Sequence, residues 1–125
     1  MITGLHHIAI LCTDRKAALD FYCNALGFTI AQDYNRPERK DEILMLEGYG
    51  FTIELFIEAG RPARPTEPEA YGLRHLALHV EDIRQTVAKI EAMGYPAEPI
   101  RPNPFTGKLL TFIKDPDGLP IEFHE

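Results

Sequence analysis

Hydrophobic and polar positions alternate along the first residues of the chain in a pattern typical of a half-buried strand. Residues 5–11 read LHHIAIL, which places His7 on one face of the predicted strand and Ile8 and Ile10 on the other. The same pattern returns 68 positions later, where residues 73–79 read LRHLALH. A repeat of this length predicts two copies of one structural module.

A helix is predicted after each of these strands. Asp14 is a favourable N-cap for the first helix, whose apolar residues recur at helical spacing until Gly27. Asp82 begins the second helix and Gly94 ends it. Three further strands are predicted after each helix. Their ranges are 28–34, 43–46 and 51–57 in the first copy, and 95–100, 109–113 and 119–124 in the second.

These elements predict an α+β fold made of two βαβββ modules in one domain, residues 1–125. Module 1 spans about 1–58, module 2 spans about 73–125, and a proline-rich linker of about 58–72 joins them. Each module alone leaves one face of its sheet uncovered, so we expect the modules to pair. The linker permits pairing within one chain or between two chains.

Composition and charge exclude several classes of protein. A chain of 125 residues with 45% hydrophobic residues and a formal net charge of −6 is typical of a globular protein that binds neither nucleic acid nor an anionic membrane. The sequence has no apolar run of membrane-spanning length and no secretory signal pattern, so we expect a cytoplasmic protein. Cys12 and Cys23 are expected to be reduced, buried small residues.

Two histidine–glutamate pairs have the same spacing. His7 precedes Glu54 by 47 positions, and His75 precedes Glu122 by the same 47. A single histidine in an apolar strand is more often a core residue than a metal ligand. Four such residues related by one shift, however, are costly to bury unless they are paired or bind a metal. Imidazoles and carboxylates without thiolates favour one divalent nickel, cobalt, zinc, manganese or iron ion per site.

Several motifs together resemble a known family. The doubled histidine and glutamate, the two aspartate-led helices, and the closing DPDG at 115–118 ahead of Glu122 resemble the vicinal oxygen chelate (VOC) superfamily. The resemblance covers essentially the whole chain and is closest to the small glyoxalase-I-like proteins of the YaeR type. It implies the glyoxalase/bleomycin resistance/dioxygenase fold, a homodimer, and a metal ion held by His7, Glu54, His75 and Glu122.

The resemblance also implies a reaction. Four protein ligands leave an octahedral ion with two open positions, which suit a small substrate with two neighbouring oxygens. A glyoxalase-I-like, metal-dependent lyase or isomerase acts on such a substrate through a metal-stabilised enediolate, as lactoylglutathione lyase does. By position Glu122 is the base of this reaction, and Glu54 is a candidate for the return proton transfer.

Two positions depart from the glyoxalase I pattern. Bacterial glyoxalase I usually has an arginine four residues after the first ligand histidine and an asparagine four residues after the first ligand glutamate, where this chain has Leu11 and Glu58. These departures weaken the case for glutathione as the substrate. Arg36, in the charged loop 35–42, and Lys108 are candidates for binding an anionic substrate, although most such residues are solvated surface charges.

Two other functions are open to a chain with this fold. A drug-binding or small-molecule-binding protein of the bleomycin-resistance type would bind without catalysis and would not need four metal ligands. A ring-cleaving dioxygenase uses two histidines and one carboxylate, whereas this chain has two carboxylates. We prefer the lyase because all four ligand positions are present.

Overall fold

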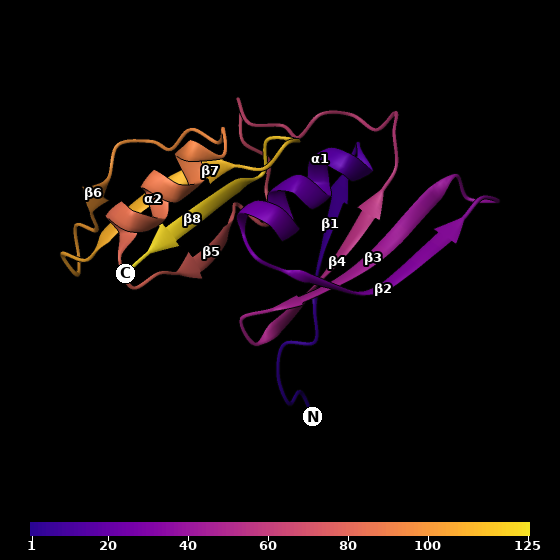
Figure 1. The fold of residues 1–125 in the computed structure, drawn as a ribbon, viewed down its shortest axis with the longest axis horizontal. Helices are drawn as coiled ribbons and strands as arrows, with labels where there is room; N and C mark the ends of the chain where they lie inside the picture. Colours follow the sequence, from indigo (N-terminus) through magenta and orange to yellow (C-terminus); the bar gives the residue numbers. More distant parts are fainter. The chain divides into compact units, whose positions relative to one another are not determined.

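Two four-stranded sheets organise the chain, which the computed structural model describes over residues 1–125. The chain divides into two units, Met1–Pro62 and Ala63–Glu125, at a point within the segment that the sequence predicts as a linker. The strand order is β1-β4-β3-β2 in the first sheet and β5-β8-β7-β6 in the second (Figure 1). The predicted α+β fold of two βαβββ modules is therefore confirmed.

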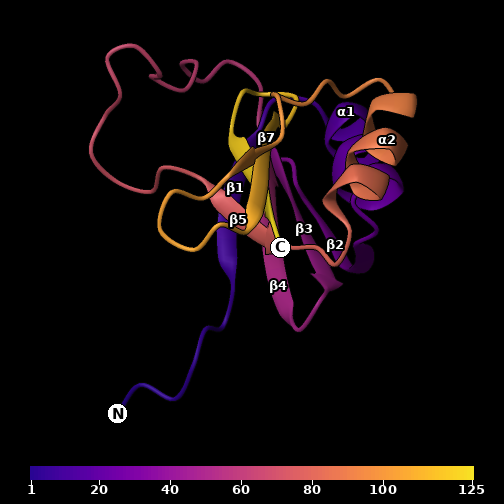
Figure 2. The same cartoon turned by 90° about the vertical axis from the view of Figure 1, so that its left-hand side faces the viewer.

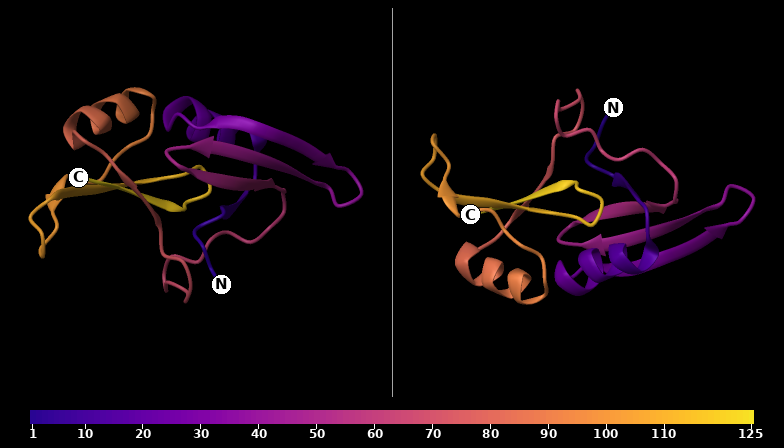
Figure 3. Two further views of the ribbon diagram at one scale, coloured as in Figure 1. Left: turned by 90° about the horizontal axis from the view of Figure 1, so that it is seen from below. Right: turned by 90° about the horizontal axis from the view of Figure 1, so that it is seen from above.

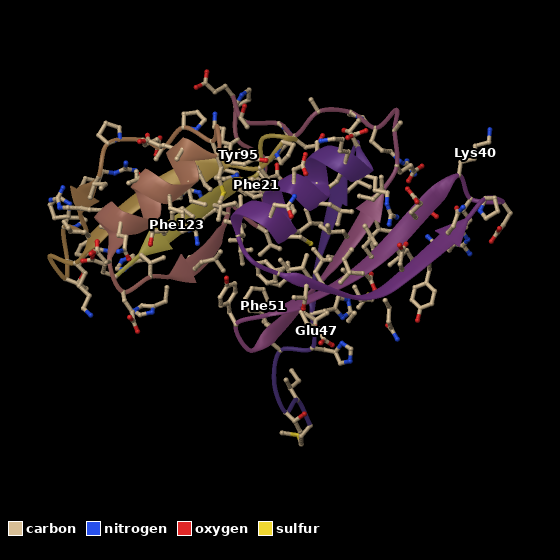
Figure 4. All side chains as sticks on the ribbon, viewed as in Figure 1. Phe21, Lys40, Glu47, Phe51, Tyr95 and Phe123 are labelled. Atoms are coloured by element: carbon tan, nitrogen blue, oxygen red, sulfur yellow. The ribbon has the colours of Figure 1, made fainter.

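The first unit has the predicted order of strand, helix and three strands. Its elements are β1 (Ile8–Cys12), α1 (Arg15–Leu19), the π-helical turn η1 (Asp20–Ala25), β2 (Thr29–Arg36), β3 (Asp41–Gly48) and β4 (Phe51–Ile57). β1 pairs with β4 in parallel, and the other pairings are antiparallel. The predicted loop 35–42 shrinks to a turn at 37–40, because β2 and β3 extend the hairpin as far as Lys40 at its tip (Figure 4).

The helical segment covers one face of the first sheet, and the other face lacks a helix (Figure 3). Side chains of β4 alternate between these faces, as expected of a strand. Ile53, Leu55 and Ile57 are buried, whereas Glu54 and Phe56 lie on the opposite parity and are half-buried. The core of the first unit therefore lies between the sheet and its helix, and Glu54 belongs to the other face.

The first helix changes from α to π geometry at Asp20. The wider turn is seen in the hydrogen bond from the Leu26 N–H to the Phe21 carbonyl, five residues back, at 2.9 Å. Phe21 and Tyr22 are both fully buried there, and their rings meet edge to face. Gly27 ends the helix, as predicted, in a left-handed conformation with φ +88°.

The second unit repeats this order with shorter strands. Its elements are β5 (Leu76–His79), α2 (Ile83–Ala92), β6 (Arg101–Pro102), β7 (Leu109–Lys114) and β8 (Pro120–His124). α2 lies on one face of this sheet (Figures 2 and 3), and Phe123, which is 2% exposed, lies beneath it (Figure 4). No helix of the chain has the length and apolar character needed to cross a bilayer.

The prediction of a strand at 95–100 is wrong, because the regular pairing with β7 is limited to the two residues of β6 that follow it. The Glu98 N–H donates to the Phe112 carbonyl at 2.9 Å, but the Glu98 carbonyl accepts from the Thr111 hydroxyl at 2.7 Å instead of a backbone N–H. Pro96 has no N–H to offer a neighbouring strand. The stretch therefore follows β7 without a regular ladder.

The turn before β8 is held by one buried carboxylate. Asp115, 4% exposed, accepts the N–H groups of Asp117 and Leu119 on its Oδ1, both at 2.9 Å. The Asp115 carbonyl also accepts the Gly118 N–H at 3.0 Å, which closes the predicted turn. This turn sets the direction in which the chain enters β8 and reaches Glu122.

Alanine at the N-cap of α2 is expected to destabilise the protein. The Asp82 side chain accepts the Gln85 N–H at 3.0 Å, and loss of such a cap costs about 1 kcal/mol. The variant Asp82→Ala should therefore show a lower urea midpoint by circular dichroism. Glu81→Ala is the matched control, because it removes the same charge from an exposed neighbour that caps nothing. Equal losses in the two variants would contradict the capping role.

Candidate metal and substrate site

A histidine and a glutamate are in contact on the second sheet. His75 directly precedes β5, and Glu122 lies in the middle of β8, opposite Ala77 in the parallel pairing. The His75 Nε2 lies 2.8 Å from the Glu122 Oε2. Because paired residues of neighbouring strands share a face, the small Ala77 side chain leaves space beside the carboxylate.

Glu122 is only 8% exposed although it bears a carboxylate. Its neighbours Ile121 and Phe123 are buried on the face that α2 covers, so strand alternation directs Glu122 to the opposite face. Phe112, its partner in the β7–β8 pairing, meets the His75 ring edge to face with 5.1 Å between centroids. No lysine or arginine forms an ion pair with Glu122, and its side-chain partner is the His75 imidazole.

The first sheet holds its pair at equivalent strand positions but with a different contact. His7 directly precedes β1, and Glu54 lies opposite Ala9 in the parallel β1–β4 pairing. The register of this parallel pairing is that of β5 with β8 moved by 68 positions. The His7 Nδ1, however, lies 2.9 Å from the Nδ1 of His6, and both histidines are exposed. The repeat in sequence is therefore a repeat in backbone pairing, and the side-chain contacts differ.

The structure joins two of the four predicted ligands, His75 and Glu122, in one contact. His7 directly precedes β1 and Glu54 lies in the neighbouring strand β4, without a hydrogen bond between their side chains. No group of three or more histidine, cysteine, aspartate or glutamate side chains is placed to hold a metal ion. The set of four ligands therefore stays a prediction.

Arg36 lies at the end of β2 and is held from two sides. Its Nε and Nη2 donate to the Asp41 carboxylate at 2.8 and 2.5 Å, and its guanidinium carbon lies 5.8 Å from the centre of the Phe56 ring. These hydrogen bonds, helped by the Arg36 charge and opposed by desolvation, lower the pKa of Asp41 from its ordinary 3.8. Asp41 above all, and more weakly Glu54, raises the pKa of Arg36. Arg36 is thus engaged by Asp41 within reach of the Glu54 charge.

A cavity of about 610 Å³ lies beside His75 in the second unit. Phe112 forms part of its lining, together with residues from 64–69 before β5 and from 96–101 around β6. A volume of this size is typical of a small-molecule site. The cavity borders a predicted metal ligand and so is a candidate position for a substrate.

The cations that line this cavity differ from the one predicted in this module. Arg101 and Lys114 are part of the lining, whereas Lys108 lies in the exposed loop before β7 and is not. The Lys108 carbonyl accepts the Asn103 N–H at 2.7 Å, which folds the loop on itself. Strand alternation is a signal that could have identified Lys114, because Lys114 lies two residues beyond Phe112 on one face of β7. No sequence signal distinguished Arg101.

The two positions that depart from the glyoxalase I pattern, Leu11 and Glu58, carry no group that would bind an anionic substrate. Leu11 is 47% exposed at its place in β1. The Glu58 Oε1 lies 2.9 Å from the Arg61 Nη2, in an ion pair three residues apart. Neither position offers a free cationic or amide group to an anionic ligand.

Two βαβββ modules, each with a histidine before its first strand and a glutamate in its last, define a fold that is matched in known proteins. The chain belongs to the Glyoxalase/Bleomycin resistance protein/Dioxygenase superfamily, whose family model matches residues 4–123. The resemblance to the VOC superfamily is therefore confirmed.

Relatives of similar length support this assignment. The chain is 46% identical over 123 residues to YaeR, an uncharacterized protein of Escherichia coli (strain K12), covering 97% of this chain and 95% of the relative. A glyoxalase family protein from Enterococcus faecalis has a similar structure, with a TM-score of 0.94, 45% identity and coverage of 98% and 97% of the two chains. Lactoylglutathione lyase of Escherichia coli O157:H7 is 30% identical over 129 residues, covering 97% and 91%.

Loss of the Arg36 guanidinium is expected to raise the pKa of Asp41 toward its ordinary 3.8. Because the folded-state pKa is depressed, this pair stabilises the fold at neutral pH, and the stabilisation is lost in acid as Asp41 is protonated. A carbon-detected NMR titration of Arg36→Met should show the shift. Lys40→Met removes a neighbouring charge that makes no contact with Asp41 and should leave its pKa unchanged. A similar pKa of Asp41 in the wild type and Arg36→Met would contradict the interaction.

Proposed function

We propose that this protein is a metal-dependent, glyoxalase-I-like lyase or isomerase in which His7, Glu54, His75 and Glu122 bind one divalent ion. Each unit supplies one histidine–glutamate pair, and the two pairs come from one chain or from two chains of a homodimer. Nickel, cobalt, zinc, manganese and iron(II) suit this mixture of imidazole and carboxylate. The 30% identity to a lactoylglutathione lyase supports the reaction class.

The surroundings of Glu122 support a metal most directly. A carboxylate that is 8% exposed, with no lysine or arginine as partner, is costly to keep ionised. The His75 Nε2 lies 2.8 Å from the Glu122 Oε2, a hydrogen-bond distance, and once the proton between them is released both groups offer lone pairs to a metal. A cation there would compensate the carboxylate charge. The residues present therefore fit a divalent metal.

A divalent ion bound by these residues would supply Lewis acidity that polarises a substrate carbonyl. The contribution of the chain itself is proton transfer. The Glu122 carboxylate accepts the proton from the carbon next to the carbonyl, and Glu54, protonated at the start, gives its proton to the neighbouring carbon. The substrate hydroxyl proton then passes to Glu54 and the proton on Glu122 passes to the former carbonyl oxygen, so both carboxyl groups regain their starting states. Low exposure of Glu122 keeps bulk water from the proton that it holds. The net change is an isomerisation of a compound with two neighbouring oxygens.

The substrate we propose is a small vicinal-oxygen compound other than a glutathione conjugate. Leu11 presents an apolar side chain where bacterial glyoxalase I usually has an arginine, and Glu58 presents a carboxylate already paired with Arg61. An anionic tripeptide would find no cationic partner at these two positions. The proposed substrate therefore differs from that of lactoylglutathione lyase, whereas the proposed proton transfers are the same.

Removal of one ligand should weaken metal binding while leaving the fold intact. We expect His75→Ala to bind nickel or zinc at least tenfold more weakly than the wild type, since even loss of a group that supports a ligand costs ten- to a hundredfold. The measurement is calorimetry on chelator-treated protein. His79→Ala is the control, because it removes an exposed histidine from the same short strand.

The same titration on Glu54→Gln tests whether the first unit contributes. Weaker binding is expected in this variant too, because an amide oxygen lacks the charge of the carboxylate. Unchanged affinity in both His75→Ala and Glu54→Gln would refute the four-ligand site. Unchanged affinity in Glu54→Gln alone would limit the site to the second unit.

Loss of the Glu122 carboxylate should abolish turnover even when metal is saturating. Methylglyoxal, with and without added thiols, is followed by NMR in buffered D₂O with nickel-loaded protein. Because Glu122 is the proposed base, Glu122→Gln should lower kcat by about 10²- to 10⁴-fold. Glu81→Gln, at an exposed position, should retain the wild-type rate. A wild-type protein that binds these compounds but never converts them would instead support a sequestering role of the bleomycin-resistance type.

A further inference from the structure

Cationic side chains gather around the cavity beside His75. Four cations and two acidic residues line it, within a chain whose formal net charge is −6. They are Arg64, Arg74, Arg101, Lys114, Glu69 and Glu98. The cavity is therefore locally positive on an acidic protein, which raises the local concentration of anions.

Two of these cations are used to hold the segment that leads to His75. The Arg64 Nη2 donates to the carbonyls of Leu73 and Arg74 at 2.7 and 3.0 Å. Arg74 in turn donates from Nε and Nη2 to the Glu69 carboxylate at 2.7 and 3.0 Å, in a bidentate pair. Both guanidinium groups already have acceptors, so they shape the wall of the cavity.

Arg101 lies against an aromatic ring, and its charge is not balanced by a close carboxylate as the charge of Arg74 is. Its guanidinium carbon lies 5.5 Å from the centre of the Phe112 ring, and stacking of this kind leaves the N–H groups at the edge of the plane free to donate. Its contact with Glu98 is long, at 3.4 Å, and the two side chains are 48% and 55% exposed, so solvent screens the pair. Phe112 also meets the His75 ring, which places Arg101 and His75 around one aromatic side chain.

Lys114 supplies a second available charge. It ends β7 two residues after Phe112, so the two side chains lie on one face of the strand. Lys114 is exposed and makes no ion pair or side-chain hydrogen bond, although it lines the cavity. Its ammonium group therefore has no acidic partner within the protein.

We propose that Arg101 and Lys114 bind a carboxylate or phosphate group of the substrate. The planar guanidinium donates two N–H groups to two oxygens of such an anion, and the ammonium adds a point charge. Resting on the proposed function, this assigns the substrate class as a compact anion, whose vicinal oxygens react at His75 and Glu122. Arg101 and Lys114 position the substrate and take no part in proton transfer.

The test uses the metal-free, full-length protein, so that an anion cannot bind to a metal ion. Inorganic phosphate and malonate are each titrated against it by NMR, and the tighter of the two identifies the favoured anion. The double variant Arg101→Met/Lys114→Met should bind that anion about tenfold more weakly or worse. The control Arg84→Met/Lys89→Met removes the same charge from exposed positions of α2, outside the cavity, and should change affinity little.

Arg101→Lys provides a second, conservative test. It keeps the charge but loses the planar fork, so its affinity should fall between those of the wild type and the double variant. No saturable binding of either anion to the wild type, or equal weakening in the cavity and control variants, would overturn the proposal.

A nickel titration separates this proposal from the proposed function. Unchanged nickel affinity in Arg101→Met/Lys114→Met supports an anion site distinct from the metal ligands, and a large loss overturns that separation. A wild-type protein that binds anions in the cavity but no divalent metal would refute the metal-dependent reaction while leaving the anion site intact.

Discussion

Parallel pairing between the first and last strands of each unit is the constraint on which the site depends. In the second sheet it sets Glu122 opposite Ala77, two residues beyond His75, and the apolar neighbours of Glu122 are buried beneath α2. Alternation then leaves the carboxylate no orientation except toward the opposite face. The burial of the apolar neighbours beneath the helix and the position of Glu122 on the opposite face are thus two results of one register, and a slip of one residue would reverse both.

The two units share this register but not its consequences. In the second unit, His75 contacts Glu122 and a cavity borders His75, whereas in the first unit His7 contacts His6. The first unit also has an arginine over an aromatic ring, because Arg36 lies over Phe56. Unlike Arg101, however, Arg36 donates close hydrogen bonds to a neighbouring carboxylate, that of Asp41. The repeat therefore keeps the backbone positions of the two histidine–glutamate pairs, and the surroundings of the pairs differ.

The sequence predicted the parts of the structure that depend on repeated, local patterns. The shift of 68 positions predicted a repeated module, whose parallel strand pairings have the same register in both units, and the hydrophobic spacing predicted a helical segment after each first strand. It failed at 95–100, where the Thr111 hydroxyl replaces a ladder hydrogen bond, because no local pattern reports such a long-range substitution. The contact between His75 and Glu122, and the cations beside it, likewise depend on loop paths and rotamers that strand periodicity does not determine.

Metal ligands alone do not select a substrate, because any compound with two neighbouring oxygens can approach the same donor set. Selection needs groups that hold the part of the substrate that does not react. Binding energy gained there orients the reacting carbon against the base, and a flexible surface lysine alone would do this poorly. Arg101 lies over Phe112, whose ring also contacts His75, so one aromatic side chain connects such a group to one of the predicted metal ligands. Specificity in this chain is therefore best sought on β6 and β7, beside the contact of His75 with Glu122 and not within it.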